Sequence, residues 1–275
     1  MRYTIKSTKY IAKNFIYLLP FAIIPAFFCA LAVDGEAIRC AIEAFFKGGL
    51  VEEWHFDHLF RAISVFNFAS WEAVLGGIFA IPVMIVCVAM LLALLDKHMR
   101  IGKRTYNGIF VKLNDNFVST AGYTILLLFV YEVWALITSA LLFFFSRIEV
   151  PFLAYALVTI SFVGMHVVLI YVISFIYLWL PCMQITGFRA GEALYYSHQL
   201  MVPIKWKILF SQVALLLATE GMVTLCSMFI SGWLFIALAT LFCALLLLLY
   251  CVRMMIVYFD RDNIDRADLR KYYQR

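Results

Sequence analysis

The sequence predicts an all-α membrane protein, a polytopic bundle of six transmembrane helices. Charged residues make up only 14% of the chain, against roughly 25% in ordinary soluble proteins, and the mean hydropathy is +0.94. Several apolar runs reach the length of about 20 residues that a membrane span requires. Because lipid offers no hydrogen-bond partners to the backbone, these runs are expected to be helices.

The first span is expected over residues 14–33, directly after a basic N-terminal segment. Its apolar run of about 20 residues exceeds the roughly 7–15 residues of a cleaved signal peptide, so it is interpreted as a span. The other five spans are expected at 72–95, 118–146, 151 to about 180–187, 205–230 and 232–258.

Basic residues predict the orientation of these spans. Eighteen of the 22 Lys and Arg residues fall in segments that six spans place on one side of the membrane. The other side carries the remaining four, Arg39, Lys47, Arg61 and Arg147. Since basic loops stay in the cytoplasm, both termini are expected there, in a multi-pass protein of the cell membrane. The net charge of +5 then reflects topology and contact with anionic lipids, with no nucleic-acid partner.

Three amphipathic stretches, near 4–15, 107–117 and 190–201, each lead into an outward-going span. Their 3.6-residue periodicity is typical of helices that lie in the membrane interface. Phe15, Phe117 and Leu200 occupy matching positions in the three stretches. The alternative is that short amphipathic linkers are common in membrane proteins.

This pattern predicts a single membrane domain, 1–275, of three pseudo-repeated units near 1–95, 96–187 and 188–258. Each unit is an interfacial amphipathic helix followed by a transmembrane hairpin. Residues 34–71 interrupt the first unit and are expected to form an extracytoplasmic cap of two helices. Residues 259–275 are expected to form a charged cytoplasmic tail, interpreted as a short solvated or interfacial helix or as a docking segment for a partner.

Residues 180–210, and the aromatic-Asp-Arg ending within the tail segment 257–270, also resemble a known family. Ala193, Leu194, Ser197 and Leu200 fit an A-L-x-x-S-x-x-L helix, and Lys205 with Trp206 begins the next span. This resembles bacterial multi-pass families typified by the membrane domain of glycerophosphodiester phosphodiesterase. The matched motifs are not catalytic and the chain contains no soluble phosphodiesterase domain, so the resemblance implies architecture and no hydrolase activity.

Two carboxylates lie deep within predicted spans. Glu132 and Glu220 are both roughly 21–23 Å from the cytoplasmic ends of their spans, at a rise of 1.5 Å per residue. A carboxylate in hydrocarbon must be protonated, paired or exposed to a wet cavity. The two acids could therefore form a proton- or cation-binding pair in a transport path. Alternatively, each is a neutral acid bonded to a neighbouring helix, for which the candidate partners are Gln212, Thr219, Thr224 and Trp134.

Two further polar residues lie in the last three spans. His166 is expected nearer the cytoplasm than the acids, so we predict no direct contact with either, and an interhelical hydrogen bond is the simplest role. Arg253 is expected to extend its guanidinium to the membrane surface.

The segment "EEWHFDH" offers a candidate metal site. Glu52, His55 and His58 are spaced to share one face of a helix, and such ligands can hold Zn²⁺. The competing interpretation is a solvated amphipathic face whose aromatic residues rest on the membrane.

No other motif points to chemistry. The sequence contains no Walker motif, no GxSxG and no dinucleotide fingerprint, and its seven cysteines form no CxxC. We therefore expect a non-enzymatic protein without cofactor that supports envelope or lipid homeostasis, with membrane lipids as partners. A role as a partner subunit or a homo-oligomer is left open. The alternative is a small-solute secondary transporter coupled to protons or cations through Glu132 and Glu220.

Overall fold

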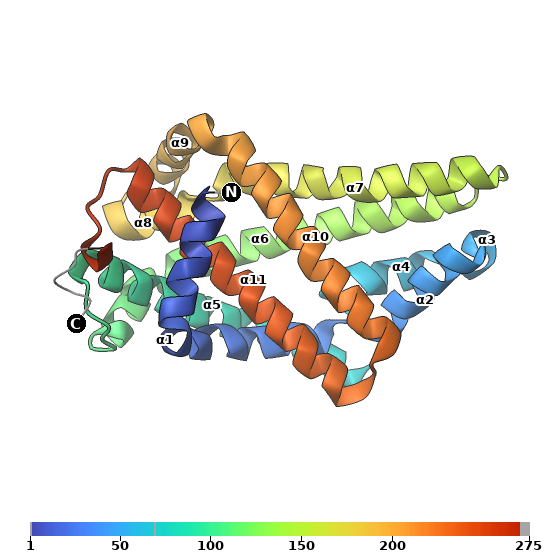
Figure 1. Cartoon of the computed structure of the whole chain (residues 1–275), viewed down its shortest axis with the longest axis horizontal. Helices are drawn as coiled ribbons and strands as arrows, with labels where there is room; N and C mark the ends of the chain where they lie inside the picture. Colours follow the sequence, from blue (N-terminus) through green and yellow to red (C-terminus); the bar gives the residue numbers. More distant parts are fainter. Residues whose placement is uncertain (1, 69, 270–275) are drawn as a thin grey trace.

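The computed structural model describes residues 2–68 and 70–269, with the backbone alone at Val51 and Glu52, and within these residues it has no β-strand. The helices form an elongated bundle (Figure 1). In chain order they are α1 (Arg2–Ala32), α2 (Gly35–Lys47), α3 (Leu50–Glu53), α4 (Phe56–Ile63), α5 (Trp71–Ile101), α6 (Ile109–Ser146), α7 (Pro151–Ile176), α8 (Trp179–Thr186), α9 (Ala190–Met201), the 3₁₀ turn η1 (Val202–Ile204), α10 (Lys205–Phe229), α11 (Gly232–Arg261) and the 3₁₀ turn η2 (Ala267–Leu269).

Within the described chain, six helical segments are long and apolar enough to cross a membrane, which confirms the predicted number of spans. They are Arg2–Ala32, Trp71–Ile101, Ile109–Ser146, Pro151–Thr186, Ala190–Phe229 and Gly232–Arg261. The start of α1, the α5–α6 loop and η2 lie at one end of the bundle, which we call the terminal face (Figure 1). The short helices α2–α4 lie toward the other end, the cap face.

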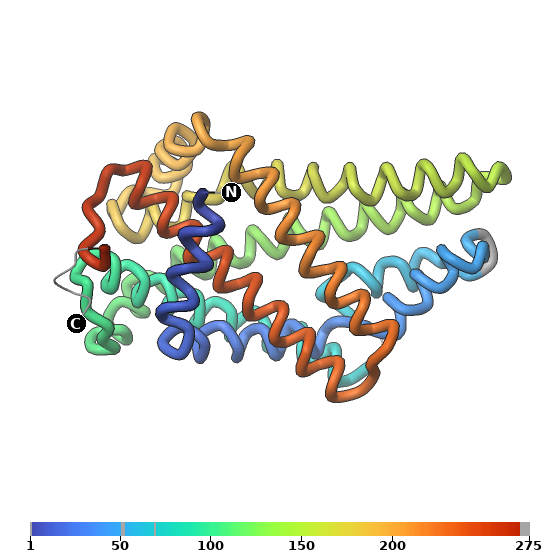
Figure 2. The backbone as a smooth tube through the Cα atoms, in the orientation of Figure 1, coloured from blue at the N-terminus to red at the C-terminus, as the bar shows by residue number. Residues whose placement is uncertain are grey.

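Helix α1 is broken near its middle. Asn14 has non-helical backbone angles (φ −122°, ψ 16°), and its side-chain amide donates to the Tyr10 carbonyl at 2.8 Å. Such a side-chain bond competes with the helical ladder. The chain turns sharply there, so residues 2–13 form a separate limb at the terminal face (Figure 2). The predicted boundary between a first amphipathic helix and the first span is thus confirmed.

The centre of the bundle is built from α1, α5 and α11. Every residue of α11 from Cys251 to Phe259 is buried, as expected of a helix that is apolar all round. Arg253 lies within this stretch and is only 1% exposed, so the expectation that it reaches the membrane surface is wrong. Its guanidinium donates instead to the Tyr177 hydroxyl at 3.3 Å and to the Ser211 hydroxyl at 3.0 Å.

The other two amphipathic stretches behave differently from each other. The third forms α9, as predicted, and η1 separates it from α10, where Pro203 interrupts the helix. The second does not form a separate helix, because residues 109–117 are the first turns of the unbroken α6. No proline or glycine occurs between Ile109 and Ala121 to end the helix there. The threefold repeat therefore stays a prediction, with this element of it corrected.

The segment between the first two spans folds into the expected cap. Asp34 caps the start of α2 by accepting from the Ala37 amide at 2.9 Å, and Gly48 ends the helix in the left-handed conformation (φ 87°). The short turn α3 and helix α4 follow, and the Trp54 indole donates back to the Ala41 carbonyl at 2.9 Å. The cap thus has the two main helices predicted, with one additional helical turn.

The tail beyond α11 packs onto the bundle as far as the structure describes it. Ala267 and Arg266 are 6% and 7% exposed, and Tyr258 donates to Asp262 at 2.8 Å. Residues 260–269 are therefore part of the terminal face. The expected tail helix is wrong for these residues, because α11 ends at Arg261 and only the 3₁₀ turn η2 follows within the described chain.

Candidate functional site

The four intramembrane polar residues singled out in the sequence lie at three separate places. Glu220 on α10 meets His166 on α7, with 2.6 Å between Oε2 and Nε2. Glu132 on α6 binds the end of the cap instead. Gln212 is buried beside Tyr177, away from both acids. The expectation that His166 contacts neither acid is wrong, and no bond joins the two acids.

The hydrogen bonds of His166 fix the number of protons in its pair with Glu220. The Nδ1 atom lies 2.7 Å from the Phe162 carbonyl, and a carbonyl can only accept, so Nδ1 carries a hydrogen. The contact between Nε2 and the Glu220 carboxyl then needs one more hydrogen, because two lone pairs would repel. Whether it sits on nitrogen or oxygen, the dyad holds one shared proton and has no net charge.

Aromatic rings fix the imidazole of His166 in place. The Trp134 ring lies edge-on at 4.9 Å between centroids, and the Phe162 ring lies at 4.4 Å. The Trp134 indole donates to the Met165 carbonyl at 2.6 Å, which fixes the indole in turn. His166 is fully buried, whereas 32% of the Glu220 side chain is exposed. Glu220 is therefore the member of the dyad that a ligand can reach.

Glu132 holds the cap to the bundle. Its Oε2 accepts from the Ser64 hydroxyl at 2.6 Å and its Oε1 accepts from the Val65 amide at 3.0 Å. The neighbouring Tyr131 hydroxyl donates to the Ile63 carbonyl at 2.7 Å. Both carboxylate oxygens of Glu132 are thus engaged by the segment that follows α4. We call this set of bonds between α6 and residues 63–65 the cap latch.

An ion pair joins the two main helices of the cap, α2 and α4. The Arg61 guanidinium on α4 donates to the Asp34 carboxylate at the start of α2, at 2.7 and 3.2 Å. Burial acts to raise the pKa of the Asp34 carboxyl, but the bonds from the Ala37 amide and from Arg61 outweigh it and lower the pKa below its usual value. Asp34 therefore stays ionised and holds α2 and α4 together.

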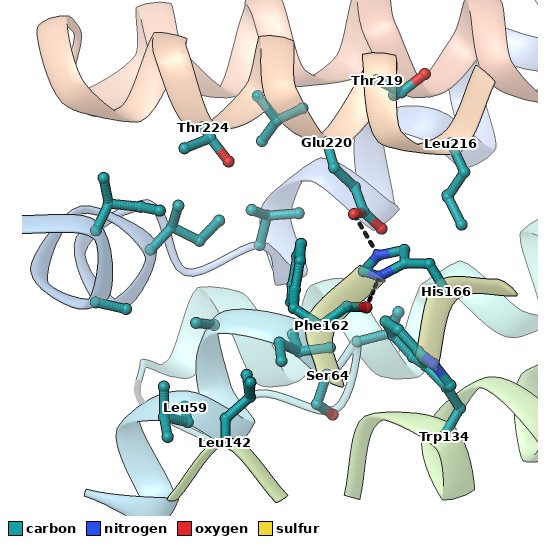
Figure 3. Close-up of a pocket in the computed structure, with 18 of the residues that line it drawn as sticks. Leu59, Ser64, Trp134, Leu142, Phe162, His166, Leu216, Thr219, Glu220 and Thr224 are labelled. Atoms are coloured by element: carbon teal, nitrogen blue, oxygen red, sulfur yellow. Dashed lines mark hydrogen bonds and ion pairs between the residues drawn. The ribbon is translucent and has the colours of Figure 1, made fainter. Parts of the chain in front are cut away.

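A cavity of about 530 Å³ lies between the cap and the bundle. Its walls come from α1, α2, α4, α6, α7, α10 and α11, and almost all of them are apolar side chains such as Phe45, Leu142 and Val223. The dyad, Ser64 and three threonines supply the main polar groups, and Figure 3 shows Glu220 and His166 pointing toward each other at this cavity. This volume falls within the roughly 300–1,000 Å³ typical of ligand pockets.

Sequence reasoning missed several residues of this site. Ser64 and Tyr131 gave no signal, because a serine in a loop and a tyrosine in a span are common. Trp134, Thr219 and Thr224 were considered only as partners of the acids. All five residues line the cavity, yet the Trp134 indole binds a carbonyl and the Thr219 hydroxyl donates to Leu215.

The candidate metal residues do not share one helical face. The helix is interrupted at Trp54 and His55, between α3 and α4, so the spacing that suggested a common face does not apply. The rings of His55 and His58 lie 5.8 Å apart. Among the side chains that the structure describes, no group of three suitable ligands is close enough to hold a metal. The side chain of Glu52 lies outside the described residues, so a site that includes it stays a prediction.

Comparisons of this chain with protein-family models, with curated proteins and with solved structures give no match. The resemblance of residues 180–210 to the bacterial multi-pass families stays a prediction. The fold and the site together define a class, a multi-pass helical membrane protein with an apolar cavity under a cap.

Proposed function

We propose that the chain is a non-enzymatic protein of the cell membrane that binds a lipid-like molecule in the cavity under its cap. Through this binding it serves envelope or lipid homeostasis, alone or as a partner subunit. The carrying observation is the cavity itself, about 530 Å³ in volume, apolar over most of its wall and polar at the dyad. An apolar chain fits such a wall, because burying apolar surface is the main driving force for binding there.

The polar end of the ligand is selected by Glu220. Because the dyad has no net charge, it favours a group that exchanges hydrogen bonds, such as a hydroxyl, amide or amine, over a bare anion. A phosphate would gain no net attraction from the neutral dyad and would find no Lys or Arg among the lining residues that the structure describes. The ligand is thus a neutral or cationic amphiphile.

The geometry of His166 disfavours catalysis. A general base needs one ring nitrogen within reach of a nucleophile. Both nitrogens of His166 are already engaged, one by the Phe162 carbonyl and one by Glu220. Ser64, a candidate nucleophile in the cavity wall, is bonded to Glu132. These bonds support a binding role.

The topology supports the same role. The basic residues gather at the terminal face, so we propose that both termini are cytoplasmic and that the cap lies outside. The cavity then opens in the outer half of the membrane, where it would take up or present a lipid.

The test is native mass spectrometry of the protein extracted into lipid nanodiscs, comparing two variants of α10. Thr224 lines the cavity, so Thr224→Phe fills it and should lower the fraction of protein that retains a bound lipid. Leu225 is 56% exposed and is not among the lining residues, so Leu225→Phe should retain the lipid. Equal retention in both variants would refute the proposal.

A second function, proton- or cation-coupled transport of a small solute, is favoured by the shared proton of the dyad. A cationic solute that binds Glu220 would displace this proton, which couples the two fluxes. In this transport mechanism, Glu220 and His166 carry the proton and Glu132 holds the cap closed. Glu220→Gln removes the exchangeable proton and should abolish proton-linked flux in proteoliposomes, whereas unchanged flux would exclude the mechanism.

A further inference from the structure

A second cavity lies at the terminal face, far along the bundle from the cap. Its volume is about 1320 Å³, and it is lined by the α1 limb, the end of α5 with the loop that follows, and the tail around η2. None of its lining residues belongs to the cavity under the cap, so the two sites are separate.

The walls of this second cavity are strongly basic. Six Lys and Arg side chains line it against a single carboxylate, that of Asp268. The basic residues are Lys6, Lys9, Lys13, Lys103, Arg104 and Arg266. Like charges held this close repel each other, so their arrangement is stabilised when an anion occupies the space between them.

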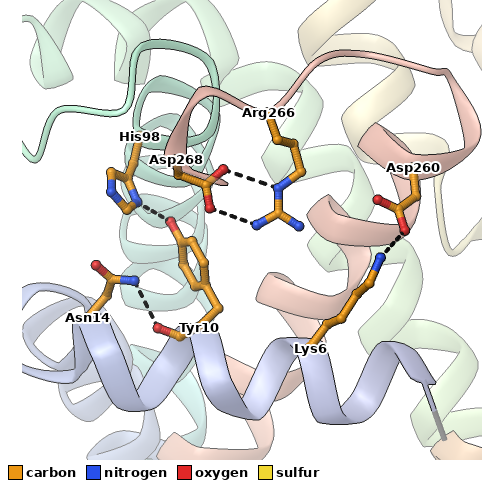
Figure 4. Close-up of polar contacts among 7 residues, drawn as sticks. All are labelled: Lys6, Tyr10, Asn14, His98, Asp260, Arg266 and Asp268. Atoms are coloured by element: carbon orange, nitrogen blue, oxygen red, sulfur yellow. Dashed lines mark hydrogen bonds and ion pairs between the residues drawn. The ribbon is translucent and has the colours of Figure 1, made fainter. Parts of the chain in front are cut away.

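Only part of this charge is neutralised by the protein. Lys6 pairs with Asp260 at 2.6 Å, and Arg266 forms a two-bonded fork with Asp268 at 2.8 and 3.1 Å (Figure 4). Lys9, Lys13 and Lys103 are exposed and have no carboxylate partner within the described chain. The cavity therefore has several ammonium groups that can reach an anion.

Buried groups give the cavity a fixed floor. Arg266 is 7% exposed and lies over the Tyr10 ring at 5.9 Å, and the Tyr10 hydroxyl is 2.5 Å from His98 Nδ1. A guanidinium has five N–H donors, of which the fork to Asp268 uses two. Asn14 is 4% exposed, and its Oδ1 atom has no hydrogen-bond partner within the described residues. The site thus combines basic donors with one unused acceptor.

We infer that this second cavity binds the phosphate group of an anionic ligand, either a lipid headgroup or a soluble phosphate ester. Arg and Lys are the side chains that proteins use for phosphate, through charge-assisted hydrogen bonds. The unused acceptor of Asn14 suits a hydroxyl beside the phosphate. The amphipathic α1 limb forms one wall, and basic pockets at such a position are suited to lipid headgroups.

The experiment uses the full chain in nanodiscs and two matched double variants. Lys13→Gln with Lys103→Gln removes two positive charges from the cavity wall. Lys112→Gln with Lys207→Gln removes two exposed lysines that do not line it. In one arm, calorimetry measures the affinity for inorganic pyrophosphate in phosphatidylcholine nanodiscs. In the other, native mass spectrometry counts phosphatidylglycerol retained from mixed nanodiscs.

We expect the cavity variant to bind about tenfold more weakly than the control variant, since a factor of ten corresponds to about 1.4 kcal/mol, of the order of one charge-assisted hydrogen bond. Loss in the pyrophosphate arm alone indicates a soluble phosphate compound, and loss in the lipid arm, with or without loss in the pyrophosphate arm, indicates a headgroup. Lys13→Arg with Lys103→Arg should restore binding. Equal binding by the two double variants in both arms would overturn the inference.

Discussion

At the scale of single residues, the meeting of His166 and Glu220 could not be predicted from the sequence. The rise per residue along each helix places the two side chains at different depths in the membrane, too far apart for contact. That arithmetic assumes helices parallel to the membrane normal. In the structure α10 crosses the direction of α7 obliquely, so equal numbers of residues do not correspond to equal depths (Figure 1).

The neutral dyad makes a specific prediction for stability. Glu220→Gln keeps an N–H donor for His166 Nε2 and should unfold at nearly the temperature of the original protein. Glu220→Ala leaves that buried nitrogen without a partner and should lose about 1–3 kcal/mol of unfolding free energy. Thermal unfolding in detergent measures both. Equal losses in the two variants would contradict the assignment of one shared proton.

At the scale of elements, the sequence predicted the six long apolar helices and the separate helix α9. Pro203 ends α9 and Gly48 ends α2, as their conformational limits require. The break at Asn14 depends on a side chain that competes for the Tyr10 carbonyl, a signal that many asparagines share. The fusion of residues 109–117 with the third span follows from the lack of any such interruption, which amphipathic periodicity alone does not reveal.

The role of Glu132 in the cap latch predicts a local effect on the cap. Glu132→Ala removes the acceptors of the Ser64 hydroxyl and the Val65 amide. Hydrogen exchange of the amides at 63–66 should accelerate on the order of tenfold or more, since a bond to a charged group contributes about 1.5–3 kcal/mol.

Glu72→Ala is the control for this measurement. Glu72 is an exposed carboxylate at the start of α5, and its removal should leave exchange at 63–66 unchanged. Exchange that is equally slow after removal of Glu132 would show that the latch does not hold the cap.

The ion pair between Asp34 and Arg61 predicts that the stability of the protein depends on pH. The folded protein lowers the pKa of Asp34 below the usual 3.8, so its contribution to stability is present above pH 3.8 and is lost as the pH falls through the folded value. Asp34→Asn keeps a good helix cap and removes the charge. This variant should unfold earlier than the original protein at neutral pH, and the difference should shrink below pH 3.8. A difference that does not change with pH would exclude the ion pair as its cause.

At the scale of the whole molecule, the proposed orientation can be tested with a residue already present. Cys40 on α2 is the one exposed cysteine, and the other six are partly or fully buried. If the cap lies outside, a membrane-impermeant maleimide should label intact cells, and Cys40→Ser should abolish the label. Labelling that occurs only in permeabilised cells would show that the cap lies in the cytoplasm, opposite to the proposed topology.

The two cavities lie toward opposite ends of the molecule and differ in the polarity and charge of their walls. The cavity under the cap has a neutral polar group in an apolar wall, and the cavity at the terminal face is rich in cations. The sequence predicted the basic face from the distribution of Lys and Arg. It could not predict the hollow beneath the cap, because that space is enclosed by side chains from seven helices.

The packing of α1 against α11 has a consequence for biosynthesis. Leu18 and Ala22 of the first helix and Leu248 and Val252 of the last belong to one buried cluster. A ribosome releases the first helix into the membrane well before the last one has been made. During translation, the face of α1 that packs on α11 must therefore be covered by lipid or by an insertion chaperone. The bundle can assemble fully only when the chain is nearly complete.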